Sequence, residues 1–219
     1  MKTEVAEIVY GWGDMPETFV YENGAKDKFF RIVFRNFLIA ADNKKIMVDA
    51  WCEGMPGWNT YDFIGPIKAL EKFNLTPDAI TDIIITHAHG DHIECVKYFK
   101  NSNIYIQRDE YENGKDNFTD DMNVILFDDE YAVCNGVNAV KIASHSVGSS
   151  VVEVITENDK IVLSGDEFYI WETIDNLKDK MNNPKFVPKD DCERKRVDFI
   201  KRYADWKIVL SHSKSEGLQ

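Results

Sequence analysis

The chain is poor in cysteine, and its cysteines are not paired along the sequence. The 219 residues hold four of them, Cys52, Cys95, Cys134 and Cys192, and this spacing matches neither a disulfide framework nor a thiolate zinc site. No apolar run approaches the roughly 20 residues that a membrane span needs. The first residues, MKTEVAEIVYGWGD, lack the basic-then-apolar pattern of a secretion signal. These absences predict a cytoplasmic protein that does not enter a membrane.

Basic residues are fewer than acidic ones. Lys and Arg number 26 against 38 Asp and Glu, which is a formal net charge of -12. A surface of this sign repels the phosphates of nucleic acids and anionic lipid headgroups, so we expect neither as a partner. The chain has no Gly/Ser-rich linker and no repeat, and we therefore expect residues 1–219 to form a single domain.

Short apolar runs alternate with segments of helical periodicity along the chain. A hairpin is predicted in the first half, with its two strands at 34–40 and 45–50. Further strands are expected at 82–86, 104–107, 137–143, 150–156, 160–163 and 207–210, and helices at 66–73, 91–99, 171–181 and 190–203. Strands followed by helices in both halves predict an α/β fold in which two sheets pack together with helices outside.

The segment THAHGDH, residues 86–92, follows a buried apolar strand at the point where a helix begins. In an extended chain His87 and His89 point the same way, because strand side chains repeat every two residues. Asp91 and His92 lie on the turn into the helix. Four ligands this close together can serve two neighbouring ions, and imidazole and carboxylate donors suit zinc, iron or manganese.

The remaining candidate ligands each follow a predicted strand. His145 comes after the strand that ends at 143, Asp166 follows KIVLSG, and His212 follows the closing strand. With these, all five histidines of the chain belong to the same pattern. Loops that leave neighbouring strands at one edge can converge, so a single metal site is predicted from these side chains.

HAHGDH, His145, Asp166 and His212 together resemble the metallo-β-lactamase superfamily in order and spacing over nearly the whole chain. The resemblance implies a four-layer αβ/βα sandwich with two divalent metal ions, zinc ahead of iron or manganese, at one edge of its sheets. By position, the ligands of the first ion are His87, His89 and His145, and those of the second are Asp91, His92 and His212, with Asp166 bridging both. Asp49 matches the acid that orients a ligand histidine.

Two metal ions a few ångström apart activate a bridging water, and this predicts a hydrolase. Asp91 is the candidate that passes a proton to the leaving group. True β-lactamases of this superfamily carry a different residue at the position of Asp166, so antibiotic hydrolysis is not expected. Tyr169, in GDEFY, and the stretch IYIQRDEYE resemble N-acyl homoserine lactone lactonases, in which a tyrosine at this offset polarises the substrate carbonyl. That branch implies a small-molecule ester or lactone substrate and is typically dimeric.

Several alternatives stay open at this point. A glyoxalase II-like thioesterase would use the same ligands, and an iron-containing redox enzyme, di-iron or persulfide dioxygenase-like, is the alternative from another class. His89 argues against the di-iron reductases, which commonly carry Glu there. Tyr169 is alternatively a packing aromatic. The segment 51–63 either forms a lip over the metals or packs Trp51 and Trp58 onto the sheet. The stretches 93–95 and 144–148 depart from the usual family sequence and leave the shape of the pocket open.

Overall fold

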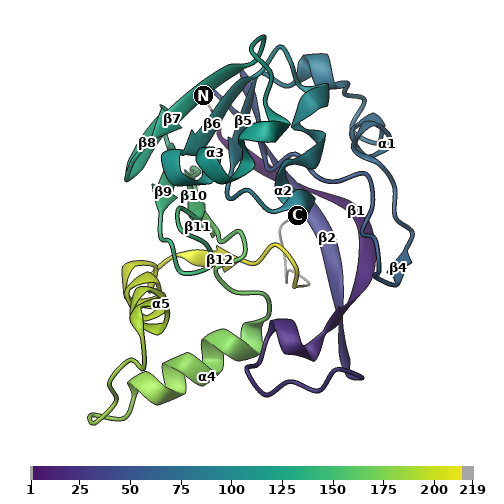
Figure 1. Cartoon of the computed structure of the whole chain (residues 1–219). Coiled ribbons are helices and arrows are strands. Elements are labelled where there is room, and N and C mark those ends of the chain that lie inside the picture. The colour runs from purple at the N-terminus through teal and green to yellow at the C-terminus, as the bar shows by residue number, and fades with distance from the viewer. Residues whose placement is uncertain (1, 214–219) are drawn as a thin grey trace.

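The computed structural model describes residues 2–213, and its strands form two sheets that lie face to face (Figure 1). The first sheet has the order β4-β1-β2-β3-β5-β6-β7 and the second the order β12-β11-β10-β9-β8. The strands of the first are β1 Glu4–Pro16, β2 Phe29–Ala41, β3 Lys44–Val48, β4 Thr60–Tyr61, β5 Asp82–Ile85, β6 Asn103–Gln107 and β7 Asn123–Phe127. Those of the second are β8 Glu130–Cys134, β9 Val137–Lys141, β10 Ser150–Ile155, β11 Lys160–Leu163 and β12 Lys207–Val209.

The helices divide between the outer sides of the two sheets. The α-helices are α1 Pro66–Glu71, α2 Gly90–Ile93, α3 Arg108–Gly114, α4 Trp171–Met181 and α5 Asp191–Arg202, and the 3-10 turns are η1 Glu17–Phe19, η2 Pro77–Ala79, η3 Glu94–Tyr98 and η4 Lys115–Asn117. In Figure 1, α4 and α5 lie together beside β12, away from α1. The predicted α/β sandwich of four layers is therefore confirmed.

Side-chain alternation along the strands builds the apolar layers. Along β5, Ile84 points between the sheets, whereas Ile83 and Ile85 point outward to the residues of α1 and η3. Along β11, Val162 faces α4 and α5 while its neighbours face the sheet interior. Strands that are buried on both faces read as continuous apolar runs. This explains why DIII and KIVL were recognisable in the sequence.

The first sheet contains a long antiparallel pair of strands, β1 and β2. Of these two strands, only β2 was predicted from the sequence. β2 and β3 form the expected hairpin, whose turn residues Asp42 and Asn43 have φ values of 48° and 65°, as a tight two-residue turn requires. β1 was missed because its glycines and Pro16 interrupt the alternation of apolar residues. Gly13 is needed there, since a Cβ would lie 2.6 Å from the ring of Phe34. That close approach lets Phe34 reach the site described below.

The predicted helix at 91–99 is wrong in one respect, because it divides into α2 and the 3-10 turn η3. The backbone N–H of Cys95 donates to the carbonyl of Trp51 at 3.0 Å, and the carbonyl of His92 accepts from Ala50 at 2.7 Å. These bonds tie the segment to the loop after β3 and replace the bonds of a regular helix. The strands β4, β7 and β8 and the helix α3 were also not predicted from the sequence.

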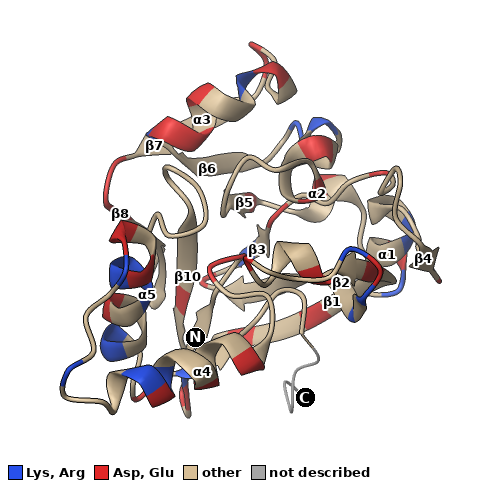
Figure 2. Ribbon diagram, turned by 60° about the horizontal axis from the view of Figure 1, so that its bottom comes forward, with Lys and Arg blue, Asp and Glu red and all other residues tan. Residues whose placement is uncertain are grey.

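Helix length and the distribution of charge can be described for the part of the chain that the structure covers. No helix in the described part of the chain combines the length and apolarity that a bilayer crossing requires. Figure 2 shows Lys and Arg mixed with Asp and Glu on α4 and α5, and mainly acidic residues on α3. On α4 and α5 the basic residues are thus interspersed with acidic ones.

Candidate metal centre

The predicted ligands lie where several strands end at one edge of the sandwich. β3, β5 and β6 run parallel in the first sheet, and β9, β11 and β12 share one direction in the second. The backbone N–H of Ser150, at the start of β10, donates to the carbonyl of Thr86 at 2.9 Å and joins the two sheets there. The loops that follow these strands carry Asp49, the segment 86–92, His145, Asp166 and His212. In open α/β sheets such edges are the usual place for ligands.

His87, His89 and His145 form a cluster that we call the three-histidine group. Nδ1 of His89 lies 3.1 Å from Nε2 of His87 and 3.0 Å from Nε2 of His145. Ligands of a tetrahedral zinc ion with bonds of about 2.1 Å are separated by roughly 3.3 Å. Two of the three nitrogen separations are close to this spacing and the third is within 4.8 Å, so the group fits one ion.

Asp91, His92, Asp166 and His212 form a second cluster, the mixed group. Oδ1 of Asp166 lies 3.4 Å from Nε2 of His92 and 3.1 Å from Nε2 of His212. Both Nε2 of His92 and Oδ1 of Asp166 are buried without a hydrogen-bond partner among the described residues. Leaving buried polar atoms without a partner is costly. Their lone pairs therefore fit a cation.

Asp166 reaches both clusters. Its Oδ1 faces the mixed group, while Oδ2 lies 3.7 Å from Nε2 of His87 and 3.8 Å from Nε2 of His145. The ligand atoms within each cluster all lie within 4.8 Å of one another. Nitrogen and oxygen donors in this combination suit zinc, iron or manganese. The residues present thus fit a pair of neighbouring ions that share one carboxylate.

Asp49, at the end of β3, orients one histidine of each cluster. Its Oδ2 accepts from Nδ1 of His92 at 2.8 Å and from the hydroxyl of Thr86 at 3.0 Å. The hydroxyl of Thr86 in turn lies 3.0 Å from Nδ1 of His87. A partner at Nδ1 leaves the lone pair of Nε2 free for a metal. The sequence identified Asp49 as the orienting acid but not the intermediate role of Thr86.

His212 is held by β2. Its Nδ1 lies 3.1 Å from the carbonyl of Val33, and the N–H of Val33 donates to the carbonyl of His212 at 3.1 Å. The buried guanidinium of Arg35 donates to the carbonyls of Leu210 and Ser213 on either side of this histidine. The last ligand is therefore fixed by a strand that lies 175 or more positions earlier in the chain.

The electrostatics of the two clusters differ. Burial and the neighbouring His92 hold the pKa of His87 well below its usual range, and burial lowers the pKa of His145 to about 4. Burial also opposes a charge on His92, but Asp166, Asp49 and Asp91 outweigh it and raise the pKa of His92. His87 and His145 are thus held neutral, whereas the carboxylates around His92 favour positive charge on it.

A cavity of about 370 Å³ lies over the clusters. Its polar floor includes His89, Asp91, Asp166 and His212, and its apolar walls are Met15, Phe19, Ile32, Phe34, Met55, Trp58 and Tyr169. The Tyr169 ring centre lies 5.7 Å from that of His145 and 5.9 Å from that of His212. Burial raises the pKa of Tyr169, so its hydroxyl stays protonated. Tyr169 therefore lines the cavity beside His145 and His212.

The segment 51–63 serves both of the uses considered from the sequence. Trp51 is fully buried and stacks on Phe99 with ring centres 6.4 Å apart. Trp58 and Met55 instead line the cavity, where Trp58 packs edge-on against Phe19 with ring centres 5.4 Å apart. The start of the segment belongs to the core and its middle forms a wall of the site.

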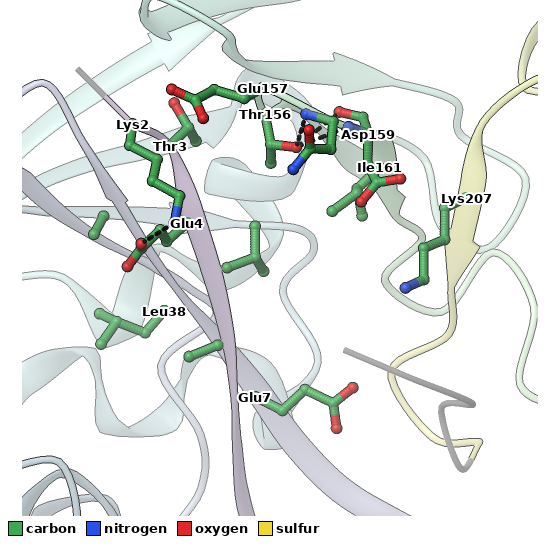
Figure 3. Close-up of a pocket in the computed structure, with 14 residues that line it drawn as sticks. Lys2, Thr3, Glu4, Glu7, Leu38, Thr156, Glu157, Asp159, Ile161 and Lys207 are labelled. Atoms are coloured by element: carbon green, nitrogen blue, oxygen red, sulfur yellow. Dashed lines mark hydrogen bonds and ion pairs between the residues drawn. The ribbon is translucent and has the colours of Figure 1, made fainter. Parts of the chain in front are cut away.

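A larger hollow of about 910 Å³ lies elsewhere, between β1, β2 and the turn that joins β10 to β11 (Figure 3). Its lining includes no histidine or cysteine. The ammonium of Lys2 pairs with Glu4 at 3.0 Å, and Thr156 bonds to the backbone of Asp159. The hollow thus brings together neither of the two metal-ligand clusters, and its size alone does not mark it as a reactive site.

Two buried glutamates beside the clusters were not assigned a role from the sequence. Glu110, in the stretch IYIQRDEYE, accepts hydrogen bonds from the loops that carry the three-histidine group. Glu167 accepts from Ser144 and Ser149, and burial raises its pKa to about 7. The serines around His145 were the available signal, because they are hydrogen-bond donors that need buried acceptors.

The family model described as the metallo-beta-lactamase superfamily matches residues 36–212. An N-acyl homoserine lactonase of Bacillus thuringiensis is 27% identical over 159 residues, which are 68% of this chain and 62% of that protein. A probable metallo-hydrolase of Methanocaldococcus jannaschii is 44% identical over 54 residues, 25% of this chain and 26% of its own length. The chain thus spans about 62% of the length of the lactonase that it matches.

Two solved structures show the same fold. An N-acyl homoserine lactone hydrolase with the product N-hexanoyl-L-homoserine bound at its catalytic metal centre superposes with a TM-score of 0.76 at 20% identity, over 97% of this chain and 94% of that one. AidC, described as a dizinc quorum-quenching lactonase, superposes with a TM-score of 0.71 at 18% identity, over 98% and 89%.

Proposed function

The chain belongs to the metallo-beta-lactamase superfamily, and from this membership we propose that it is a two-metal hydrolase that cleaves a carboxylic ester or a lactone. The observation that carries the proposal is the convergence of seven imidazole and carboxylate side chains into two adjacent clusters beneath one cavity. In the second cluster, Nε2 of His92 and Oδ1 of Asp166 are buried without a hydrogen-bond partner among residues 2–213.

The three-histidine group would hold one ion, and Asp91, His92 and His212 would hold the second, with Asp166 between them. We propose zinc, because the donors are imidazole nitrogens and carboxylate oxygens; iron and manganese accept the same set. When bound, two such ions lower the pKa of a bridging water and polarise a carbonyl. Asp49 and Thr86 keep His92 and His87 turned toward the ions.

Asp91 is our candidate for proton transfer. Its Oδ2 lies 3.6 Å from Nε2 of His92 and 3.8 Å from Nε2 of His212, and the residue also lines the cavity. A carboxylate in this position can take a proton from the attacking water and deliver it to the leaving alkoxide. This proton transfer requires that Asp91 face both the metal ligands and the cavity that would hold the substrate.

Tyr169 is our candidate for stabilising the developing oxyanion. Its ring packs against His145 and His212 at the cavity wall, and its raised pKa keeps the phenol a hydrogen-bond donor. A donor aimed at the position where negative charge develops lowers the barrier because it needs no reorganisation during the reaction.

The cavity favours a neutral substrate with an apolar group. Its walls are aromatic rings and thioethers, and its lining includes no Lys or Arg. An anionic phosphodiester would meet Asp91 and Asp166 without a cationic side chain to compensate, whereas an acyl chain can pack against Phe19, Met55 and Trp58. Because a matched relative is named an N-acyl homoserine lactonase, we propose acylated lactones as the first class to test.

The test combines elemental analysis of the purified protein with a substrate panel of lactones, carboxylic esters, thioesters and phosphodiesters. We expect about two equivalents of metal, with zinc dominant, and faster turnover of lactones or esters than of the other classes. A preference for thioesters would favour a glyoxalase II-like enzyme. Iron with thiol-dependent oxygen consumption would favour a redox enzyme. Protein loaded with two metals that opens no lactone and cleaves no ester contradicts the proposal.

We also infer that the protein works in the cytoplasm as a single domain. The four cysteines are free, as a reducing compartment favours. Both sheets share one apolar interior, which supports the single-domain interpretation. Dimerisation, which the resemblance implies, stays a prediction that size-exclusion chromatography with light scattering can check.

A further inference from the structure

Glu110 connects the two loops that carry the three-histidine group. It lies on α3, and its side chain is almost completely buried, with 1% of the residue exposed. Oε2 accepts from the backbone N–H of Ala88 at 2.8 Å, and Oε1 accepts from the hydroxyl of Ser146 at 2.6 Å and from the N–H of Gly148 at 2.7 Å. Ala88 separates His87 from His89, and Ser146 follows His145. One carboxylate thus binds next to all three ligands.

The surrounding packing leaves Glu110 little freedom. The side chain of Gln107 caps the start of α3 and accepts from the N–H groups of Asp109 and Glu110. A side chain at Gly148 would overlap Gln107, and a Cβ at Gly114 would lie 2.9 Å from Cβ of Ala88. Glycine at these positions lets α3 approach both ligand loops closely. The carboxylate is therefore held in place by its own helix and cannot follow the loops if they move.

We propose that Glu110 is a positioning residue that sets the spacing of His87, His89 and His145 and thereby the metal affinity of the three-histidine group. This inference rests on the proposed function, since it assumes that the group binds a metal. Glu110 touches no ligand side chain and acts through the backbone and Ser146. None of its hydrogen bonds reaches the mixed group, whose His92 and His212 are held by Asp49 and Val33. Its effect is therefore specific to one cluster.

A carboxylate is needed at this position because all three partners are donors. A glutamine of the same shape has one acceptor oxygen, and its amide nitrogen is itself a donor. In Glu110→Gln, the amide would face either the N–H of Ala88 or the pair from Ser146 and Gly148. One of the two ligand loops then loses its acceptor and moves away, although the volume of the side chain is unchanged.

The test measures metal binding to metal-free protein by competition with a coloured chelator, using Zn²⁺ as the probe. We expect Glu110→Gln to bind one equivalent like the wild type and the other about 10- to 100-fold more weakly, the usual effect of changing a residue behind a metal ligand. Ser146→Ala removes one of the three donors and should weaken the same equivalent by less. It also serves if the Gln variant does not fold.

Asp82→Asn is the matched control. Like Glu110, Asp82 is buried, with 1% exposed, and accepts several hydrogen bonds. It lies at the end of β5 that is opposite to the ligand segment 86–92. This variant should bind both equivalents with wild-type affinity. If it loses metal as Glu110→Gln does, the loss reflects general destabilisation and the inference is wrong.

A double-mutant comparison identifies the cluster concerned. In a His145→Ala background the three-histidine group is already broken, so adding Glu110→Gln should cost no further metal affinity. In a His212→Ala background it should cost the full 10- to 100-fold. Equal effects in both backgrounds, or wild-type binding by Glu110→Gln itself, overturn the inference. If wild-type protein binds no pair of ions, the proposed function fails first. If it binds two and hydrolyses esters while Glu110→Gln matches it, only the role of Glu110 fails.

Discussion

The two ends of β5 bury acidic groups in opposite ways. At its start, Asp82 accepts from Lys44 at 2.7 Å, from the Thr81 hydroxyl at 2.6 Å, from the Tyr105 hydroxyl at 2.9 Å and from Asn103 at 3.1 Å. Past its other end, Asp166 is as deeply buried but its Oδ1 has no hydrogen-bond partner among the described residues. Asp166 comes from the loop after β11, which packs against Thr86, so a satisfied and an unsatisfied carboxylate lie near the opposite ends of β5.

This difference is the one expected between a structural acid and an acid that we propose binds metal. Burial alone would raise the pKa of Asp82, but its hydrogen-bond donors outweigh burial and lower it. Burial likewise opposes the charge of Asp166, and the neighbouring His212 and His92 lower its pKa instead. The partners of Asp166 are histidines, and the lone pairs of these histidines face the same point. We therefore propose that a bound cation is the missing partner of all of them. Burial by itself therefore does not distinguish the two roles; the partners do.

The largest effect is expected from a substitution of Asp166, the acid at the metal site. Asp166→Asn keeps the shape but removes the charge that faces both clusters, so we expect loss of at least one metal equivalent and a fall in kcat/KM on the order of 10³-fold. The measurements are elemental analysis and steady-state kinetics with the best lactone or ester. Asp82→Asn, at the other end of the strand, should keep both metals. If Asp166→Asn kept full metal occupancy and full activity, the proposed difference between Asp82 and Asp166 would be wrong.

Removing the metals tests the same comparison without a mutation. Ligands that bind only the folded state stabilise it by about 4 kcal/mol at a thousand times Kd. For a domain of this size, 1 kcal/mol shifts Tm by about 2–4 °C, so a chelator should lower Tm by roughly 8–16 °C. Differential scanning fluorimetry with and without chelator measures the shift. It should persist in Asp82→Asn and be smaller in Asp166→Asn, which we expect to bind less metal; an unchanged wild-type Tm contradicts the prediction.

A smaller effect is expected from a substitution at Tyr169. This residue lies at the metal-site end of β5, and changing it tests catalysis separately from metal binding. Tyr169→Phe removes only the hydroxyl, so both metal equivalents should remain while kcat falls by about 10²-fold, the usual effect of losing one oxyanion donor. Kinetics on metal-quantified protein decides the outcome. Full activity in this variant would return Tyr169 to the role of a packing aromatic.

The smallest effect concerns stability at the start of β5. Asp82→Asn should lower the free energy of unfolding of the metal-free protein by roughly 2 kcal/mol at neutral pH, because a charged hydrogen-bonding partner is lost. The pKa of Asp82 is lowered from 3.8 in the folded state, so its contribution is present above that pH and lost as the pH falls below it. Urea denaturation between pH 3 and 7 should show the two proteins converging at low pH. A difference that does not change with pH contradicts this account.

The local motifs were readable from the sequence because their chemistry is local. Five histidines and two aspartates that each follow a predicted strand indicated one metal site, and the family resemblance implied how they divide into two groups. The bounds of α4 and β11 were also predicted correctly, since Ile174 and Leu177 repeat at helical spacing and KIVL is buried on both faces. In these segments one periodicity dominates.

Other features depended on distant partners and were missed for that reason. β1 has interrupted alternation, and its register comes from pairing with β2 across a bulge at Val9 and Gly11. The 3-10 turn after α2 exists because the backbone of Cys95 bonds to Trp51. Glu110 and Glu167 look like surface acids until the loops that donate to them are brought close.

The sequence by itself determined the ligand types, their order and the strand ends from which they emerge, because strand periodicity and donor chemistry are properties of short segments. Only the tertiary structure decided that Tyr169 and Trp58 line the same cavity, that Thr86 links Asp49 to His87, and that Glu110 accepts hydrogen bonds from both loops that carry the three-histidine group. These relations join residues from different sheets and loops, and their geometry is set by packing between layers, which no single segment encodes.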